Sequence, residues 1–164
     1  MILDLKRIFV TDNSSLPLDF ELDLSELEFS KAYPLKKPIA VRGNVENRAG
    51  VVSLKVKCIG EYDADCDRCG EPTVKPFEIE VDRVVVESLS GEDTGEYIIA
   101  QGYKLDIDEV ATDEVVLGLP VKHLCSKECK GVCSECGKNL NSGPCSCTKD
   151  AVDPRLAVLA ELLK

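Results

Sequence analysis

The spacing of the cysteines constrains this chain more than any other feature. Six of the nine cysteines lie in the segment CSKECKGVCSECGKNLNSGPCSC, at 125–147. Two more form a Cys-x-x-Cys pair upstream, at Cys66 and Cys69, and both Cys-x-x-Cys pairs in the chain are followed by Gly. In such a knuckle the two sulfurs point to one side, and the Gly allows the backbone to turn back sharply. The cysteines therefore predict a compact metal-binding segment, and the rest of the chain is the scaffold for it.

Cys58 is the cysteine that stands apart from this pattern. It follows Leu54 and Val56 on the apolar side of an alternating segment, which predicts a strand with Cys58 buried as a small hydrophobic residue. The other eight cysteines make two sets of four thiolates, and four is the number of ligands that structural zinc requires. The eight candidate ligands are Cys66, Cys69, Cys125, Cys129, Cys133, Cys136, Cys145 and Cys147.

These eight thiols can be divided between two sites in two ways. In the first division, Cys66 and Cys69 join Cys125 and Cys129, and the last four cysteines close a short loop on themselves. In the second division, the two Cys-x-x-Cys pairs bind one ion together, as in a zinc ribbon, and the remaining four thiols bind another. We favour the first division, because its second site closes a shorter loop.

The compartment decides between metal ligands and disulfides. The N-terminal residues MILDLKRIF lack the charged region, apolar run and cleavage site of a secretory signal. No stretch of the chain approaches the roughly 20 apolar residues of a membrane span. We therefore expect a cytoplasmic protein without membrane contact, in which clustered cysteines bind metal. Two Zn²⁺ ions are the expected cofactors, and an iron–sulfur cluster is the alternative for four thiolates.

The residue inventory argues against an enzyme. A site of four thiolates leaves no open coordination position for water, so a catalytic zinc ion is not expected. The chain has one histidine, His123, which we expect to be solvated on a loop rather than to bind metal. General acid–base chemistry therefore has few candidates, and no Gly-rich phosphate loop is present.

Charge is distributed unevenly along the chain. Residues 1–121 carry 13 basic and 25 acidic side chains, whereas residues 122–149 carry five Lys and two Glu. The acidic body should repel nucleic acid and attract a basic partner. Four lysines are interleaved with the cysteines and are candidate contacts to RNA or another partner, although lysines there would also keep a thiolate-rich segment soluble. They are Lys122, Lys127, Lys130 and Lys138.

The remaining patterns predict an α+β fold that is mainly an antiparallel sheet. Residues 1–8 alternate loosely and suggest a strand, and alternating strands on both sides of CDRCGEP predict a long hairpin with the first knuckle at its tip. Residues 106–119 predict one packed helix that begins at Asp106 or Asp108 and ends before Pro120. We expect an acidic β-rich domain at 1–121, a cysteine-rich zinc-binding segment at 122–149, and a C-terminal helix at 150–164, where Pro follows an Asp N-cap.

The order of these motifs resembles the YceD family, also described as the large ribosomal RNA subunit accumulation protein family. The resemblance covers roughly residues 35–164 and is carried by CDRCGEP, the helix ending in GLPV, CKGVCSECGKNLNSGPCSC and DPRLAVLAELL. It implies a bacterial, non-enzymatic role in ribosome biogenesis, namely the accumulation of large-subunit (23S) ribosomal RNA. The partner would be a large-subunit rRNA precursor. The alternative from the charge distribution is an acidic chaperone or adaptor for a basic ribosomal protein of the large subunit.

Overall fold

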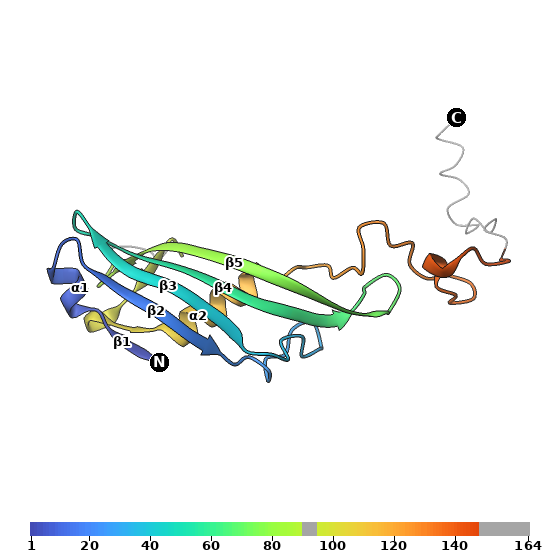
Figure 1. Ribbon diagram of the computed structural model, residues 1–164, viewed down its shortest axis with the longest axis horizontal. Helices are drawn as coiled ribbons and strands as arrows, with labels where there is room; N and C mark the ends of the chain where they lie inside the picture. The colour runs from blue at the N-terminus through green and yellow to red at the C-terminus, as the bar shows by residue number, and fades with distance from the viewer. Residues whose placement is uncertain (90–94, 148–164) are drawn as a thin grey trace, which may run out of the picture.

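The computed structural model describes residues 1–89 and 95–147 of the 164-residue chain. Its main element is a five-stranded sheet in the order β2-β3-β4-β5-β6, and a second, two-stranded sheet pairs β1 with β7. The longest described helix, α2, lies against one face of the large sheet (Figure 1). The fold is therefore α+β and mostly sheet, as predicted. The elements are β1 (Ile2–Asp4), α1 (Lys6–Val10), β2 (Ser15–Leu22), β3 (Ile39–Arg48), β4 (Val51–Asp65), β5 (Pro72–Val86), β6 (Tyr97–Ile99), the 3₁₀ helix η1 (Gln101–Tyr103), β7 (Lys104–Asp106), α2 (Ile107–Gly118) and the 3₁₀ helix η2 (Leu140–Ser142).

Strands β4 and β5 form the longest ladder of the sheet. They pair antiparallel from Val52 opposite Val85 to Asp65 opposite Pro72. The pairing of β2, β3 and β4 is also antiparallel, whereas β6 runs parallel to β5. The ladder reaches far beyond the rest of the sheet at the end where residues 66–71 connect its two strands (Figure 1). This extension carries the first Cys-x-x-Cys pair away from the main body.

The core lies between the large sheet and its helices. Leu54 and Cys58 of β4 are completely buried, and Val56 between them is 3% exposed. The predicted burial of Cys58 is therefore confirmed, and burial raises the pKa of its thiol. Strand β3 contributes Ile39, Val41 and Val45 to the same core. The core is thus assembled by the alternation of apolar residues along neighbouring strands.

Helix α2 begins and ends where the sequence predicts. Asp106 is its N-cap, and the side chain of Asp106 accepts a hydrogen bond from the backbone N–H of Asp108 at 3.2 Å. The helix ends at Gly118, where a Cβ atom would lie 2.6 Å from a side-chain carbon of Ile79 on β5. The missing side chain at Gly118 therefore lets the end of the helix rest closely on β5, and the chain continues from there toward the tip of the ladder.

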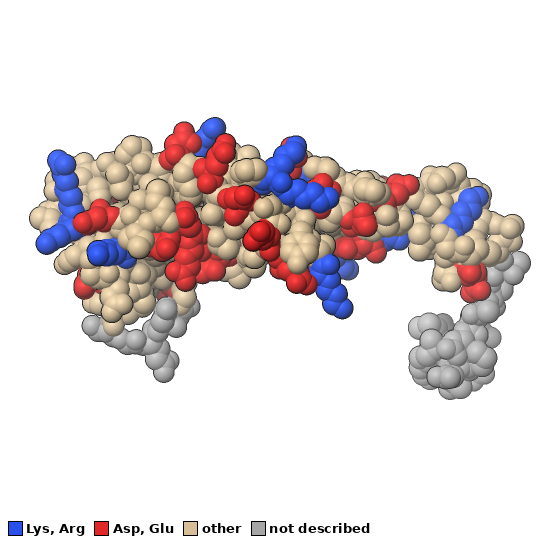
Figure 2. All heavy atoms as spheres, turned by 90° about the horizontal axis from the view of Figure 1, so that it is seen from below, with Lys and Arg blue, Asp and Glu red and all other residues tan. Residues whose placement is uncertain are grey.

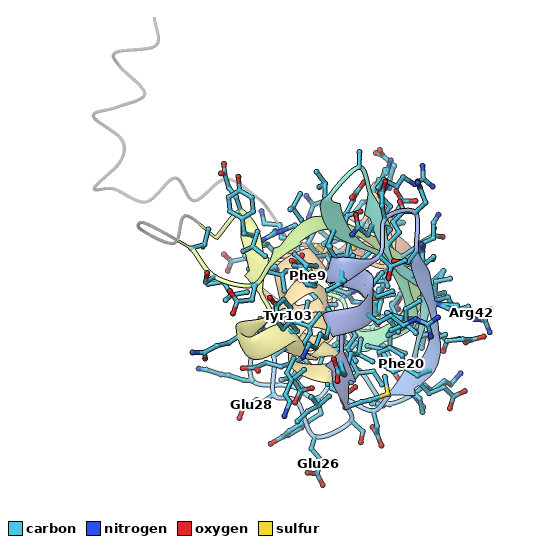
Figure 3. The ribbon with its side chains drawn as sticks, turned by 90° about the vertical axis from the view of Figure 1, so that its left-hand side faces the viewer. Phe9, Phe20, Glu26, Glu28, Arg42 and Tyr103 are labelled. Atoms are coloured by element: carbon cyan, nitrogen blue, oxygen red, sulfur yellow. The ribbon has the colours of Figure 1, made fainter. Side chains whose placement is uncertain are left out.

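The N-terminal residues depart from the prediction of a strand over residues 1–8. Strand β1 ends at Asp4, and helix α1 follows. Leu5 and Ile8 are three residues apart and are both buried, because one turn of helix places them on the same face. Phe9 of this helix meets Tyr103 edge-on, with ring centroids 5.3 Å apart (Figure 3). Residues 6–10 therefore form a helix with one buried face instead of continuing the predicted strand.

The predicted C-terminal helix at 150–164 lies outside the described residues. None of the helices in the described ranges is both long and apolar enough to cross a membrane.

Candidate metal centres

The first Cys-x-x-Cys pair lies in the turn that connects β4 to β5. The backbone N–H of Cys66 donates to the carbonyl of Glu71 at 2.9 Å, and the N–H of Gly70 donates to the carbonyl of Cys66 at 2.8 Å. Gly70 has a φ of +70°, a left-handed conformation that glycine adopts without strain. The resulting tight turn keeps Cys66 and Cys69 side by side, and both are buried.

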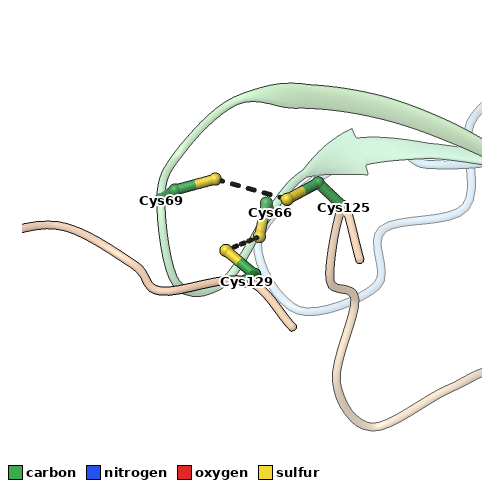
Figure 4. A group of neighbouring side chains, drawn as sticks. All are labelled: Cys66, Cys69, Cys125 and Cys129. Atoms are coloured by element: carbon green, nitrogen blue, oxygen red, sulfur yellow. Dashed lines mark hydrogen bonds between the residues drawn. The ribbon is translucent and has the colours of Figure 1, made fainter. Parts of the chain in front are cut away.

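The segment after α2 returns to this turn and brings two more thiols. The backbone N–H of Asp67 donates to the carbonyl of His123 at 2.8 Å, and Cys125 and Cys129 follow a few residues later. Arg68 donates from Nη1 to the carbonyl of Cys129 at 2.9 Å. Four sulfurs thus lie within 4.8 Å of one another, two from the turn and two from the returning segment (Figure 4). They belong to Cys66, Cys69, Cys125 and Cys129.

The sulfur positions suit a metal ion better than disulfides. The Sγ atoms of Cys66 and Cys129 are 3.8 Å apart, and those of Cys69 and Cys125 are 3.6 Å apart. A tetrahedron with zinc–sulfur bonds of about 2.3 Å has sulfur–sulfur edges of about 3.8 Å. A disulfide requires about 2.05 Å. The spacing therefore agrees with four thiolates around one ion.

The second group of sulfurs is closed within a single stretch of chain. Cys133, Cys136, Cys145 and Cys147 also place their sulfurs within 4.8 Å of one another. The N–H of Gly137 donates to the carbonyl of Cys133 at 2.9 Å, so this turn repeats the geometry of the first knuckle. Cys136 is exposed, in contrast to the largely buried thiols of the first group. The structure thus groups the eight thiols as in the first of the two divisions that the sequence leaves open.

Hydrogen bonds from the backbone prepare one thiol in each group for metal binding. Burial pushes the pKa of Cys66 upward, but backbone N–H groups, led by that of Cys125, lower this pKa to about 6. The N–H groups of Cys136 and Glu135 likewise lower the pKa of Cys133 to about 6. Both thiols are therefore mostly ionised at neutral pH, which favours binding of a cation.

In the same groups the pKa values of Cys69 and Cys147 are raised to about 12. For Cys69, a backbone hydrogen bond from Glu71 lowers the pKa, but burial and neighbouring sulfurs outweigh it. For Cys147, the neighbouring Cys136 and burial both raise the pKa.

Metal binding by these two sulfur groups is expected to release more protons below pH 6 than above it. At pH 7, Cys66 and Cys133 are already thiolates, so metal binding displaces no proton from them. As the pH falls through their pKa of about 6, both become protonated, and binding at pH 5.5 must then displace about 0.7 more proton per site than at pH 7. Calorimetric titrations at pH 7 and pH 5.5, in buffers of different ionisation enthalpy, measure this number. An unchanged number of released protons would contradict the assignment of these pKa values.

The environment of His123 contradicts the prediction of a solvated side chain. His123 is only 4% exposed, and its ring lies against Tyr62 with centroids 4.8 Å apart. Its Nε2 atom is 3.0 Å from the carbonyl oxygen of Thr73, and its backbone N–H donates to Asp67 at 2.6 Å. The prediction was wrong because these partners lie on the β4–β5 ladder and in the turn at its tip, far away in the sequence. His123 holds the returning segment against the ladder and is not part of either sulfur group.

The four candidate lysines all lie on the surface. Lys122, Lys127, Lys130 and Lys138 are exposed. Lys138 donates from Nζ to the carbonyl of Pro144 at 2.9 Å, and among the described residues the other three form no ion pair. Figure 2 shows acidic side chains spread along one face of the body, with fewer basic ones between them. The cysteine-rich segment therefore presents lysines next to an acidic scaffold.

Sequence reasoning missed a polar residue that contacts the first sulfur group. Asn141 donates from Nδ2 to the Sγ atom of Cys129 at 3.3 Å, and this hydrogen bond lowers the pKa of Cys129. Asn141 lies between Cys136 and Cys145, within the loop that the second group closes. The Asn-Leu-Asn run was visible in the sequence, but nothing in its spacing indicated which sulfur it would reach.

A protein-family model and several known proteins match this chain. A family model described as "Large ribosomal RNA subunit accumulation protein YceD" matches residues 54–163. YlbN of Bacillus subtilis (strain 168) is 27% identical over 156 residues, which cover 92% of this chain and 89% of YlbN. A protein of Mycobacterium tuberculosis (strain ATCC 25618 / H37Rv) is 29% identical over 103 residues, which cover 60% of this chain and 49% of that protein.

A plant relative carries the same description. The chloroplastic "Large ribosomal RNA subunit accumulation protein YCED homolog 1" of Arabidopsis thaliana is 34% identical over 59 residues, which cover 36% of this chain and 18% of the relative. No solved structure matches the chain significantly. The family model spans more than half of the chain and includes all eight clustered cysteines. The chain therefore belongs to the YceD family of large ribosomal RNA subunit accumulation proteins.

Proposed function

We propose that this protein is a non-enzymatic ribosome-biogenesis factor that supports the accumulation of large-subunit (23S) ribosomal RNA. The observation that carries the proposal is the family match over residues 54–163, which contains most of the β4–β5 ladder, helix α2 and both cysteine groups. Such a factor acts where ribosomes are assembled, which in a bacterium is the cytoplasm. Its expected partner is a precursor of the large-subunit rRNA.

We also propose that each cysteine group holds one structural Zn²⁺ ion. Thiolates are soft donors that suit zinc, and the sulfur–sulfur distances of 3.8 and 3.6 Å in the first group fit a tetrahedral site. Four sulfur ligands leave no open position for water, which supports a role in structure rather than in catalysis. Cys66 and Cys69 lie at the tip of the ladder, and Cys125 and Cys129 lie in the segment after α2. An ion shared by these four thiolates joins the ladder to that segment. Measurement of the bound metal in the purified protein tests this part of the proposal.

The exposed lysines of the cysteine-rich segment are the proposed contacts to RNA. The body repels phosphate at long range because residues 1–121 carry 25 acidic and 13 basic side chains. The segment from 122 to 147 instead presents Lys122, Lys127, Lys130 and Lys138 on a backbone fixed by the two sulfur groups. Lysines in fixed positions neutralise phosphates and orient the protein on RNA without reading its sequence.

Reversing three of these charges is expected to weaken association with large-subunit rRNA. A chain with Lys127→Glu, Lys130→Glu and Lys138→Glu replaces attraction to phosphate with repulsion, which should lower affinity by about tenfold or more at moderate salt. The matched control is Lys6→Glu, Lys31→Glu and Lys104→Glu, which changes the net charge equally at exposed lysines outside the segment. Binding of both chains to large-subunit precursor RNA is measured over a range of salt concentrations.

The same variants test the function in cells. A strain that lacks the gene should have a lower ratio of 23S to 16S rRNA, and the control variant should restore that ratio while the segment variant should not. Equal RNA binding by the two variants would contradict direct contact through these lysines. An unchanged rRNA ratio in the deletion strain would contradict the proposed function itself.

The acidic body supports a second candidate, an adaptor that binds a basic ribosomal protein of the large subunit. Complementary charge favours such a partner, because the balance of 25 acidic against 13 basic side chains in residues 1–121 attracts a cation-rich surface. In this case the segment variant would still bind isolated large-subunit proteins, and its RNA association would be unchanged.

A further inference from the structure

Two asparagines of the second sulfur group's loop reach across to the first group. Asn141 donates from Nδ2 to the Sγ atom of Cys129 at 3.3 Å, and its Oδ1 atom accepts from the backbone N–H of Lys130 at 2.8 Å. Asn139 donates from Nδ2 to a carboxylate oxygen of Glu71, the residue before β5, at 2.8 Å. The loop that carries both asparagines is closed by sulfurs of the second group. The side chains of these asparagines nevertheless contact residues of and around the first sulfur group.

Backbone contacts hold the same loop against the first knuckle. Arg68 lies between Cys66 and Cys69 in the chain, and its carbonyl accepts a hydrogen bond from the N–H of Val132 at 3.1 Å. Leu140 donates from its N–H to the carbonyl of Gly131 at 2.8 Å. Gly131 has a φ of +73°, and a Cβ atom there would lie 3.1 Å from the carbonyl oxygen of Arg68. The chain between the two sulfur groups is therefore packed directly on the first one.

We propose that the two metal centres are coupled, because occupation of the second holds Asn141 in the position where it stabilises the Cys129 thiolate of the first. The coupling rests on the zinc sites of the proposed function. It adds to them an order in which the sites form and the residue that links them. Asn141 is a positioning residue, since it contacts a ligand and not the ion.

The chemistry of the first site explains why one hydrogen bond has a large effect. Four thiolates around a divalent ion leave an excess of negative charge, which N–H donors to sulfur offset. Cys129 is 3% exposed, so little water is available to replace the amide of Asn141 if the loop moves away. Outer-sphere hydrogen-bond partners of metal ligands typically contribute about 10- to 100-fold in metal affinity.

Loop length indicates which site forms first. The second group joins cysteines that all lie within residues 133–147, whereas the first joins Cys66 to Cys129, 63 positions away. Closing the shorter loop costs less conformational entropy. The second site therefore forms as a local unit, and its loop then completes the surroundings of the first. By thermodynamic linkage, the first site must raise the affinity of the second by the same factor.

Zinc titration of the full-length protein in competition with a chelator, followed by native mass spectrometry, tests the coupling. The unmodified chain is expected to pass from no zinc to two zinc ions with little singly loaded protein. Asn141→Ala should let the singly loaded form accumulate and weaken binding of the other ion by about tenfold or more. Asn141→Asp should weaken it further, because a carboxylate cannot donate to the thiolate and repels it. Ser142→Ala, the next exposed residue of the loop, is the matched control and should titrate like the unmodified chain.

A second set of variants separates coupling from local damage. With Cys145→Ser and Cys147→Ser, the chain keeps only the first site, and its affinity should also fall by about tenfold or more. Adding Asn141→Ala to this chain should cause little further loss, since the loop no longer holds the amide in place. A titration of Asn141→Ala that matches Ser142→Ala would overturn the coupling while leaving two zinc sites intact. An unmodified chain that binds no zinc would overturn both the coupling and the proposed sites.

Discussion

Removal of the proposed zinc ions with a chelator is expected to release residues 125–147 from the β4–β5 ladder while the five-stranded sheet stays folded. The apolar surface buried around the first sulfur group is small: Leu124 and Cys125 pack on Cys66, Cys69 and Cys129. Structural zinc contributes on the order of 10–16 kcal/mol to the folding of small zinc-binding peptides. The sheet instead has its own core, built around residues such as Leu54 and Ile39. Amide hydrogen exchange of residues 129–143 should approach that of an unfolded chain, whereas β3, β4 and β5 remain protected.

Two single substitutions in the same region provide a second test and its control. Cys66→Ser removes one ligand of the first site and should release the same residues without a chelator. Ser126→Ala changes an exposed side chain of the same segment and should leave exchange unchanged. His123 should stay protected in every case, since it is held by Asp67, Thr73 and Tyr62 rather than by sulfur. Loss of the strand signal in circular dichroism on chelation would show that the sheet depends on the metal, contrary to this expectation.

Leu54→Ala is expected to lower the free energy of unfolding of the sheet by about 2–5 kcal/mol. Leu54 is completely buried in β4, with Val45 opposite it on β3 and Arg83 opposite it on β5. Truncation leaves a cavity in the core on the face of the sheet, which neighbouring strands cannot fill without breaking their hydrogen bonds. Urea unfolding followed by circular dichroism measures the loss, with zinc at a saturating concentration throughout.

The matched control is Val51→Ala on the same strand. Val51 is 52% exposed, so its truncation should change the free energy of unfolding by less than about 0.5 kcal/mol. Leu54→Ala should also leave the number of bound zinc ions unchanged under conditions where the protein is folded. Equal effects of the two substitutions would contradict the placement of Leu54 in the core.

Local patterns predicted the elements whose formation depends on neighbouring residues. The helix that begins after Asp106 and ends before Pro120 is confirmed, because capping and termination are interactions between residues close in sequence. Burial of Cys58 is confirmed for a similar reason, since alternation along one strand determines which side chains share a face. The prediction of a strand over 1–8 was wrong after Asp4, because burial of Leu5 and Ile8 on one face favours a helical turn.

Contacts between distant segments were beyond the reach of such patterns. The ring of His123 lies on the β4–β5 ladder, which the sequence alone could not place beside it. Asn141 reaches a sulfur of the other group because the segment 129–141 packs on the first knuckle. Both positions follow from how α2 rests on β5 and from the direction in which the chain leaves that helix.

The sequence by itself determined which eight thiols are available as ligands, where helix α2 begins and ends, and which part of the chain is acidic. These properties depend on residue type and on spacing along a few turns of backbone. Only the tertiary structure decided how the thiols are grouped and which polar side chains support them. Grouping requires the end of the β4–β5 ladder and the segment after α2 to meet, and that meeting depends on packing of the whole sheet and helix against each other.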